Sequence, residues 1–178
     1  MTPALQSHAT LSLCRLAPVI PVLVVDEIRH AAPLARALVR GGLPVLEVTL
    51  RTPAALEAIA EMARVPGARV GAGTVLSASD AARARAAGAQ FAVSPGATDA
   101  LVSAGGRPPR EALRRPLPQA LICPTGGITE ASAPAWLNLQ NVVCVGGSWV
   151  APGAMVRAGD WAGIERLARA AAALPRGD

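Results

Sequence analysis

The sequence predicts an α/β fold built around a parallel β-sheet. Apolar, β-branched segments of strand length alternate along the chain with segments whose apolar residues recur at helical spacing. The strand-like segments are continuous apolar runs, as expected for a sheet that is covered on both faces. Polar side chains stand at their carboxyl ends, where a TIM-type (β/α)₈ barrel builds its active site. We therefore expect a barrel rather than an open sheet.

Two strand–helix units begin the pattern. Ala17–Val25 (APVIPVLVV) is a continuous apolar run, and Asp26–Arg40 follows it with helical spacing before a glycine pair. Pro44–Leu50 (PVLEVTL) is the second predicted strand. Its helix is expected to have Thr52 as N-cap and Pro53 at the first position, because a threonine hydroxyl accepts a free amide hydrogen and proline has none to satisfy.

The middle of the chain adds a third unit and a fourth strand. Ala68–Val75 (ARVGAGTV) is a strand-like run that ends in a glycine-rich turn. The helix after it is expected to begin at Ser77, with Asp80 completing a signal similar to a capping box. Gln90–Ser94 is a short predicted strand.

The pattern resumes in the last third of the chain. Ala120–Pro124 is a predicted strand, and the helix after it is expected to be capped by Thr129. Asn141–Val145 is the sixth predicted strand. A last amphipathic helix is expected over Asp160–Leu174.

Six strand–helix units are about two short of a closed barrel. A barrel of roughly 250 residues uses about 30 for each unit, and this chain has 178. The stretch 97–119 includes GGRPPREALRR, whose prolines and arginines cannot form a buried strand. We expect one domain over residues 1–178, with a deletion around 102–118 and about six of the eight units.

The deletion leaves two arrangements open for the sheet. If the shortened sheet closes, the strand at 90–94 lies beside the strand at 120–124. Otherwise each of them is an edge of the sheet, and exposed apolar edges favour aggregation or oligomers.

Composition excludes several classes of protein. The chain is 52% apolar, but no apolar run reaches the roughly 20 residues of a membrane helix. The N-terminal segment lacks the basic start of a secretory signal. Three cysteines, Cys14, Cys123 and Cys144, form no CxxC pair and are odd in number, which predicts reduced thiols. We expect a cytoplasmic protein with no membrane partner.

The charged residues argue against a metal site and against nucleic acid binding. Two histidines are too few for a His-based zinc site, so no metal is expected. All 17 basic residues are arginine, which leaves no lysine in the chain. The net charge of +5 comes from arginines scattered over helical segments with few aromatic residues, a pattern typical of helix surfaces. A positive field also suits a small anionic substrate.

Glu47 is the strongest candidate catalytic residue. It lies inside the apolar segment VLEVTL, and even spacing places Glu47, Thr49 and Arg51 on one face of the strand. In a barrel that face points inward. A carboxyl group with a raised pKa can act as general acid and base, and an arginine can bind a carboxylate with both nitrogens. A structural ion pair is the alternative, which we rank second because charged side chains are rare inside core strands.

Glycine-rich turns follow four of the predicted strands. The turn ending in Thr74 is as typical of a tight βα connection as of a binding loop, and the turn at Pro95 is a weaker signal. Gly126-Gly127 and Gly146-Gly147-Ser148 follow the last two strands, where barrels commonly bind phosphate through free backbone amides. The two pairs together predict a phosphate site.

These motifs, in this order, closely resemble the family of 2-keto-3-deoxy-6-phosphogluconate (KDPG) and 4-hydroxy-2-oxoglutarate (KHG) aldolases. The resemblance covers nearly all of the chain except 102–118. It implies a (β/α)₈ barrel, usually a homotrimer, that cleaves a keto-deoxy sugar acid phosphate to pyruvate and glyceraldehyde 3-phosphate without a cofactor. The segments that carry it are APVIPVLVV (17–25), VLEVTLRT (45–52), VGAGTV (70–75), GAQFAVSPG (88–96), CPTGGI (123–128) and VVCVGGSWV (142–150).

The resemblance also implies roles for individual residues. Glu47 matches the family's general acid and base, and Arg51 matches its ligand for the pyruvyl carboxylate. Thr74 lies beside the same moiety in the family, with Pro95 in the next turn. The phosphate-binding turns match Gly126, Gly127, Gly146, Gly147 and Ser148.

One departure concerns the reaction itself. The family's Schiff-base lysine stands between the SPG and CPTGGI motifs, within the block that is missing here. Three interpretations follow: an aldolase, as the family implies; an inactive remnant that binds pyruvate or phosphorylated sugar acids; or a deleted or mispredicted reading frame. The chemistry favours the second or the third, because arginine's pKa is too high for it to replace a neutral amine.

Overall fold

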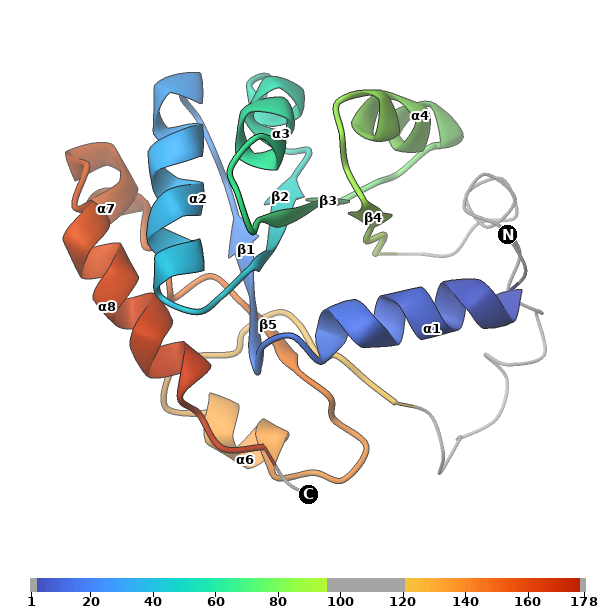
Figure 1. The fold of residues 1–178 in the computed structure, drawn as a ribbon, viewed down its shortest axis with the longest axis vertical. Helices are drawn as coiled ribbons and strands as arrows, with labels where there is room; N and C mark the ends of the chain where they lie inside the picture. Colours follow the sequence, from blue (N-terminus) through green and yellow to red (C-terminus); the bar gives the residue numbers. More distant parts are fainter. Residues whose placement is uncertain (1–2, 96–120, 177–178) are drawn as a thin grey trace.

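The computed structural model describes residues 3–95 and 121–176. Within these ranges helices and parallel strands alternate, as predicted (Figure 1). The elements are α1 (Pro3–Cys14), β1 (Val19–Leu23), the 3₁₀ helix η1 (Ile28–His30), α2 (Ala31–Arg40), β2 (Val45–Thr49), α3 (Ala55–Ala63), β3 (Arg69–Gly73), α4 (Ala78–Ala86), β4 (Phe91–Ala92), α6 (Ala133–Leu137), β5 (Val145–Gly147), α7 (Gly153–Ala158) and α8 (Trp161–Ala172).

Five strands form one parallel sheet in the order β4-β3-β2-β1-β5. The register aligns Val22 of β1 with Glu47 of β2, and Glu47 with Gly71 of β3. Parallel strands place all their carboxyl ends at one end of the sheet. The turns that carry the predicted site residues therefore gather there.

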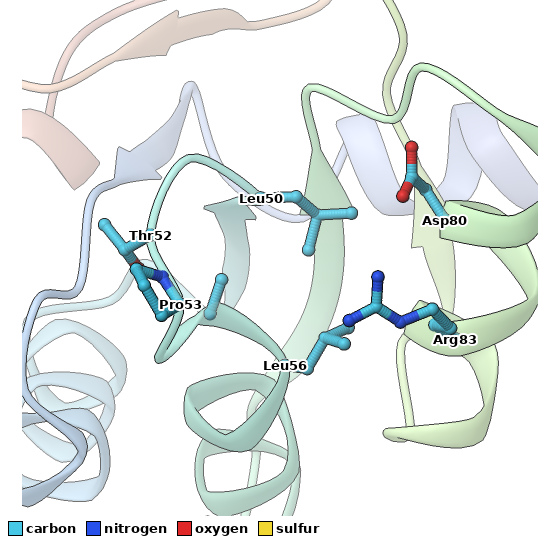
Figure 2. Close-up of a pocket in the computed structure, with 7 residues that line it drawn as sticks. Leu50, Thr52, Pro53, Leu56, Asp80 and Arg83 are labelled. Carbon is cyan, nitrogen blue, oxygen red and sulfur yellow. The ribbon is translucent and has the colours of Figure 1, made fainter.

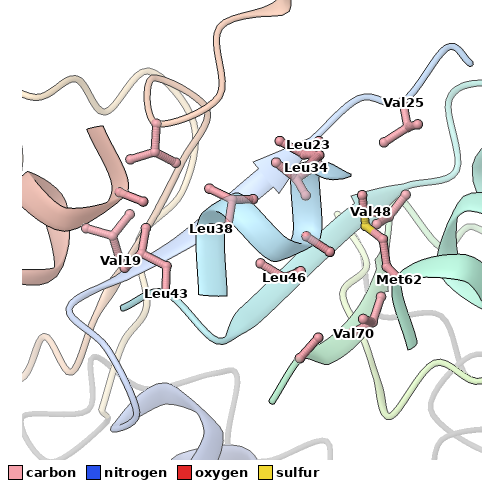
Figure 3. Close-up of a cluster of buried hydrophobic side chains, with 14 of the residues drawn as sticks. Val19, Leu23, Val25, Leu34, Leu38, Leu43, Leu46, Val48, Met62 and Val70 are labelled. Carbon is pink, nitrogen blue, oxygen red and sulfur yellow. The ribbon is translucent and has the colours of Figure 1, made fainter. Parts of the chain in front are cut away.

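Four helices cover one face of the sheet. Helices α8, α2, α3 and α4 lie side by side over it, with contacts between each neighbouring pair (Figure 1). The strands send every second side chain toward these helices, where Leu23, Leu46 and Val70 pack against Leu34 and Met62 (Figure 3). Burying each such side chain stabilises the fold by about 1.5–3 kcal/mol.

The opposite face of the sheet, called the inner face below, carries the remaining strand side chains. Val45 alternates with the helix-facing Leu46, and it packs with Ile20 and Cys144 in a second, smaller cluster. Leu13 and Cys14, at the end of α1, pack against this cluster. The sequence did not predict helix α1, because this segment has neither a capping signal nor strong amphipathicity. Its position depends on this packing.

The predicted strand at 120–124 is reduced to a single bridge, Ile122 to Val142. The amide of Gly146 donates to Pro124 O at 2.8 Å, so this segment lies beside β5. Five strands and one bridge therefore stand where six strands were expected. The last strand begins at Val145, later than predicted, because the extended glycines pair with Ile20 and Pro21 of β1.

Among the described residues, β4 pairs only with β3, and no bridge joins it to the segment at 121–124. The second predicted arrangement, in which each is an edge, holds for this part of the chain. Apolar side chains are exposed at one edge, where Leu121 and Ile122 are about half accessible. Residues 97–119, which the sequence marks as the interruption, lie outside the described ranges.

One of the three predicted helix caps is confirmed. The Ser77 hydroxyl accepts a hydrogen bond from the Asp80 amide at 3.0 Å, and Asp80 accepts one from the Leu76 amide at 3.2 Å. Thr52 is not a cap, because its hydroxyl donates instead to Val25 O at 2.6 Å, and the helix begins after Ala54. This bond connects the turns that follow β1 and β2.

The prediction for Thr129 is also wrong. Helix α6 begins later, at Ala133, with Ser132 as its N-cap. The Thr129 hydroxyl accepts from the Ser132 amide at 3.3 Å, which closes the turn before the helix. In the described part of the chain, no helix is long and apolar enough to span a membrane.

Candidate functional site at the carboxyl ends of the strands

Glu47 lies on the inner face of β2, between β1 and β3, and is only 8% exposed. Gly73 of β3 leaves room for its carboxyl group, since a Cβ at this position would overlap Glu47 Oε1. Gly71 leaves room in the same way for the ring of Phe91. The glycines of the VGAGTV motif thus have a packing role that the sequence did not reveal.

Burial raises the pKa of the Glu47 carboxyl, and the positive charge of Arg51 offsets part of this rise. Thr49, on the same face, is buried and donates its hydroxyl hydrogen to Leu23 O at 3.0 Å. A carboxyl group whose pKa is raised holds its proton more readily than an ordinary one and can still release it, as a general acid and base must. The position therefore suits a general acid and base.

Replacing Glu47 by glutamine is expected to raise the melting temperature at pH 7.5. Because the folded-state pKa of Glu47 is raised, its contribution to stability is present below its unfolded pKa and is lost as the pH rises through the folded value. Glutamine keeps the shape and removes the charge. Calorimetry from pH 4 to pH 8 should show the advantage of Glu47→Gln growing with pH.

Asp80→Asn provides a control of opposite sign. Hydrogen bonds from Ser77 and the Leu76 amide hold the pKa of Asp80 below its usual value. Its stabilisation is therefore present above its unfolded pKa and is lost as the pH falls, so the asparagine variant should be least stable, relative to wild type, at neutral pH. An advantage of Glu47→Gln that is the same at all pH values would contradict burial of a charged carboxylate.

Arg51 and Thr74 follow the ends of β2 and β3. Arg51 is exposed, and no ion pair joins it to any described residue. Thr74 has a φ of 58°, the only positive φ of a non-glycine residue in the described ranges. This left-handed conformation costs about 1–3 kcal/mol and is common at binding sites. The amides of Leu50 and Val75 hold the turn by donating to Gly73 O and Val93 O.

The two glycine pairs have different surroundings. Gly126 and Gly127 have φ values of 91° and 67°, and a Cβ at either would meet no atom within 4 Å. Their backbone is therefore open to solvent. Gly146 and Gly147 are buried, and a Cβ there would crowd Thr125 and overlap Trp149. Only the first pair offers free space beside its backbone.

The remaining predicted residues lie at the same end of the sheet. Pro95 follows β4 and is exposed, and Ser148 follows β5 and is exposed. The structure thus places Glu47 and Gly146 inside their strands and the other predicted site residues at the end of a strand or in the turn that follows a strand or the bridge at Ile122. The predicted phosphate turns lie across β1 from Glu47.

A pocket of about 180 Å³ lies elsewhere, between α3 and α4 (Figure 2). Leu50, Leu56, Asp80 and Arg83 line it together with the turn at Thr52 and Pro53. None of the predicted site residues contributes to it. In the described ranges no group of three or more His, Cys, Asp or Glu side chains is arranged to hold a metal ion.

The family model for KDPG and KHG aldolase matches this sequence in two segments, 11–107 and 102–167. The chain belongs to the KDPG and KHG aldolase family. The 2-dehydro-3-deoxy-phosphogluconate aldolase of Zymomonas mobilis is 44% identical over 202 positions, which take in 93% of this chain and 96% of the relative. The KHG/KDPG aldolase of Escherichia coli is 40% identical, over 90% of this chain and 93% of the relative.

Solved aldolases of the family have the same fold. The Zymomonas mobilis enzyme with 3-phosphoglycerate superposes with a TM-score of 0.81 at 43% identity, covering 93% of this chain and 95% of that one. The Legionella pneumophila KDPG aldolase, with pyruvate captured as a covalent carbinolamine, gives 0.82 at 35% identity and covers 92% and 98%. The predicted TIM-barrel-like α/β class is confirmed.

This aldolase homologue is shorter than its relatives inside the aligned region. The Zymomonas mobilis alignment has 202 positions, and 93% of 178 residues is about 166, so about 36 positions have no counterpart here. The two segments matched by the family model meet at residues 102–107.

Proposed function

We propose that this chain is a member of the aldolase family that binds keto acids and phosphorylated sugar acids but does not cleave them by Schiff-base chemistry. The observation that carries the proposal is the position of Glu47, a buried carboxyl group on the inner face of β2 in a chain without lysine. The proposal includes a single domain with a deletion around 102–118. The shortened alignment supports this deletion.

Glu47 and Arg51 are proposed to form the part of the site that receives the keto acid. A protonated Glu47 can donate a hydrogen bond to the keto oxygen, and burial favours that form by raising the pKa of this group. The guanidinium of Arg51 can bind the carboxylate with two parallel hydrogen bonds. Thr74 and Pro95, in the neighbouring turns, are proposed to border the same moiety.

The proposed phosphate site consists of Gly126, Gly127, Gly146, Gly147 and Ser148. The open backbone of Gly126 and Gly127 supports amide contacts with a phosphate oxygen, and the exposed Ser148 can add a hydroxyl donor. The solved Zymomonas mobilis relative contains 3-phosphoglycerate, a ligand with both a carboxylate and a phosphate. A ligand of this chemistry would use both halves of the proposed site.

The reaction step that this chain is proposed to lack is the formation of a covalent bond between the keto acid and an amine. The carbinolamine in the Legionella pneumophila relative joins pyruvate to an amine, and lysine is the side chain that supplies a primary amine. This chain has arginine at all 17 basic positions. Arginine remains protonated at physiological pH and is not nucleophilic. The proposal is therefore that the chain binds these acids without cleaving them.

Cellular context is part of the proposal. We infer a cytoplasmic protein of carbohydrate metabolism, related to the Entner–Doudoroff pathway through the substrates of its relatives, and a homotrimer. The exposed apolar edge at Leu121 and Ile122 supports self-association.

Titration calorimetry of the folded chain with pyruvate and with 3-phosphoglycerate tests the proposed binding. We expect binding in the millimolar range, tighter for the phosphorylated acid because it engages both halves of the site. Arg51→Ala should weaken binding by roughly 10- to 100-fold, since a hydrogen bond to a charged group contributes about 1.5–3 kcal/mol. Arg36→Ala, an exposed arginine of α2, is the matched control and should change nothing.

Two results would remove the proposed function. One is the absence of heat and of any thermal shift at millimolar ligand in a sample shown to be folded by circular dichroism. The other is equal binding by wild type, Arg51→Ala and Arg36→Ala, which would mean that Arg51 does not contact the carboxylate.

A further inference from the structure

Three cysteines from separate parts of the sequence meet on the inner face of the sheet. Cys14 ends α1, Cys123 follows the bridge at Ile122, and Cys144 precedes β5. All three belong to the cluster around Ile20 and Val45. Cys14 and Cys123, both partly buried, pack against the buried part of this cluster, which includes Cys144. Thiols that pack in one cluster are candidates for a disulfide, which requires the two Cβ atoms to approach to about 3.5–4.5 Å.

We propose that Cys14 and Cys123 are an oxidation-sensitive pair, which hydrogen peroxide converts to a disulfide joining α1 to the segment beside β5. This inference does not depend on the proposed ligand. It goes beyond the expectation, made from the number and spacing of the cysteines, that they are reduced thiols. Their pairing could not be found in the sequence, because 108 residues separate the two positions.

Burial distinguishes the reactive pair from the third thiol. Cys144 is completely buried, whereas Cys14 and Cys123 are partly accessible. Peroxide can therefore reach Cys14 and Cys123 without unfolding the sheet.

The two accessible thiols take different roles in the proposal. The neighbouring thiols of Cys123 and Cys144 lower the pKa of Cys14, which favours its thiolate. The proposal therefore takes Cys14 as the thiol that peroxide oxidises and Cys123 as the thiol that resolves the product.

The reaction takes place in two steps. The Cys14 thiolate attacks one peroxide oxygen, the O–O bond breaks, and the products are Cys14 sulfenic acid and hydroxide, which takes a proton to become water. The Cys123 sulfur then attacks the Cys14 sulfur and displaces a second water. In total, two thiols lose two electrons and two protons to one hydrogen peroxide. A reducing thiol returns both to the starting state.

The experiment uses the full chain, reduced with a phosphine and then treated with hydrogen peroxide while folded. Remaining thiols are blocked with an alkylating reagent, and the protein is digested with trypsin and a glutamate-specific protease. Cleavage after Arg15 and Glu130 places each cysteine on its own peptide. We expect a mass loss of two hydrogens and a cross-linked peptide pair that contains Cys14 and Cys123.

Thermal denaturation gives a second result. A disulfide that closes a loop of this length restricts the unfolded chain, so the oxidised protein should melt about 5 °C or more above the reduced protein. Cys14→Ser and Cys123→Ser should show neither the cross-link nor the rise. Cys144→Ala should retain both, since its thiol takes no part in the bond.

Three outcomes would overturn the proposal. They are three free thiols after oxidation of the folded protein, a cross-link that includes Cys144, and a cross-link that forms as readily in protein unfolded by guanidinium. Peptide mapping of the wild type distinguishes them even if a variant fails to fold.

Discussion

The purified chain is expected to leave 2-keto-3-deoxy-6-phosphogluconate uncleaved at enzymatic rates. Class I cleavage begins when a neutral amine attacks the keto carbon and gives an iminium ion that accepts the electrons of the breaking C–C bond. No lysine is present to form it. Glu47 can move a proton, but without the iminium the carbanion that forms on cleavage has no electron sink.

A coupled assay with lactate dehydrogenase measures the pyruvate released, and the Zymomonas mobilis relative provides the positive control. Borohydride reduction in the presence of pyruvate, followed by intact mass analysis, tests for an imine. The α-amino group, with a pKa of about 7.7–8.0, permits slow trapping at the chain terminus, so any adduct must be mapped. Turnover of about 1 s⁻¹ or faster, with an adduct inside the chain, would show that the reaction proceeds without lysine.

Gly73→Ala is expected to destabilise the protein by about 1–3 kcal/mol, because the new methyl group overlaps the carboxyl group of Glu47. The reason is specific to this contact. In a Glu47→Ala background the space is empty, so the same substitution should cost almost nothing. A double-mutant cycle, measured by denaturant unfolding, gives the coupling between the two positions.

Gly71→Ala is the matched control for this cycle. It lies two residues earlier on the same strand, and its methyl group would meet the ring of Phe91 rather than Glu47. It should destabilise the protein equally in both backgrounds. If Glu47→Ala rescues Gly71→Ala as well, or rescues neither variant, Gly73 does not define the space for the Glu47 side chain.

Several features of the site follow from local sequence. The even spacing in VLEVTL correctly placed Glu47 and Thr49 on one face of β2, because side-chain direction in a strand alternates with every residue. The Ser77 cap was also predictable, since its partner, the Asp80 amide, is three residues away. Both depend on neighbours within a few positions.

Other features depend on partners that are distant in sequence. Thr52 has the residue type of a cap, but the carbonyl of Val25 competes for its hydroxyl. The sequence leaves a tight βα turn and a binding loop open for the glycines before Thr74, whereas Gly73 makes room for Glu47 on the adjacent strand. The register between β2 and β3 decides this role of Gly73, and a single sequence does not give the register of its strands.

By itself, the sequence determined the fold class and the order of most of its strand–helix units. Both follow from hydrophobic periodicity, which is a property of the chain read in order. Only the tertiary structure decided that β4 and the segment at 121–124 do not pair within the described residues, and that the three cysteines meet. These depend on strand register and on the packing of α1, which are set by contacts between residues far apart in the chain.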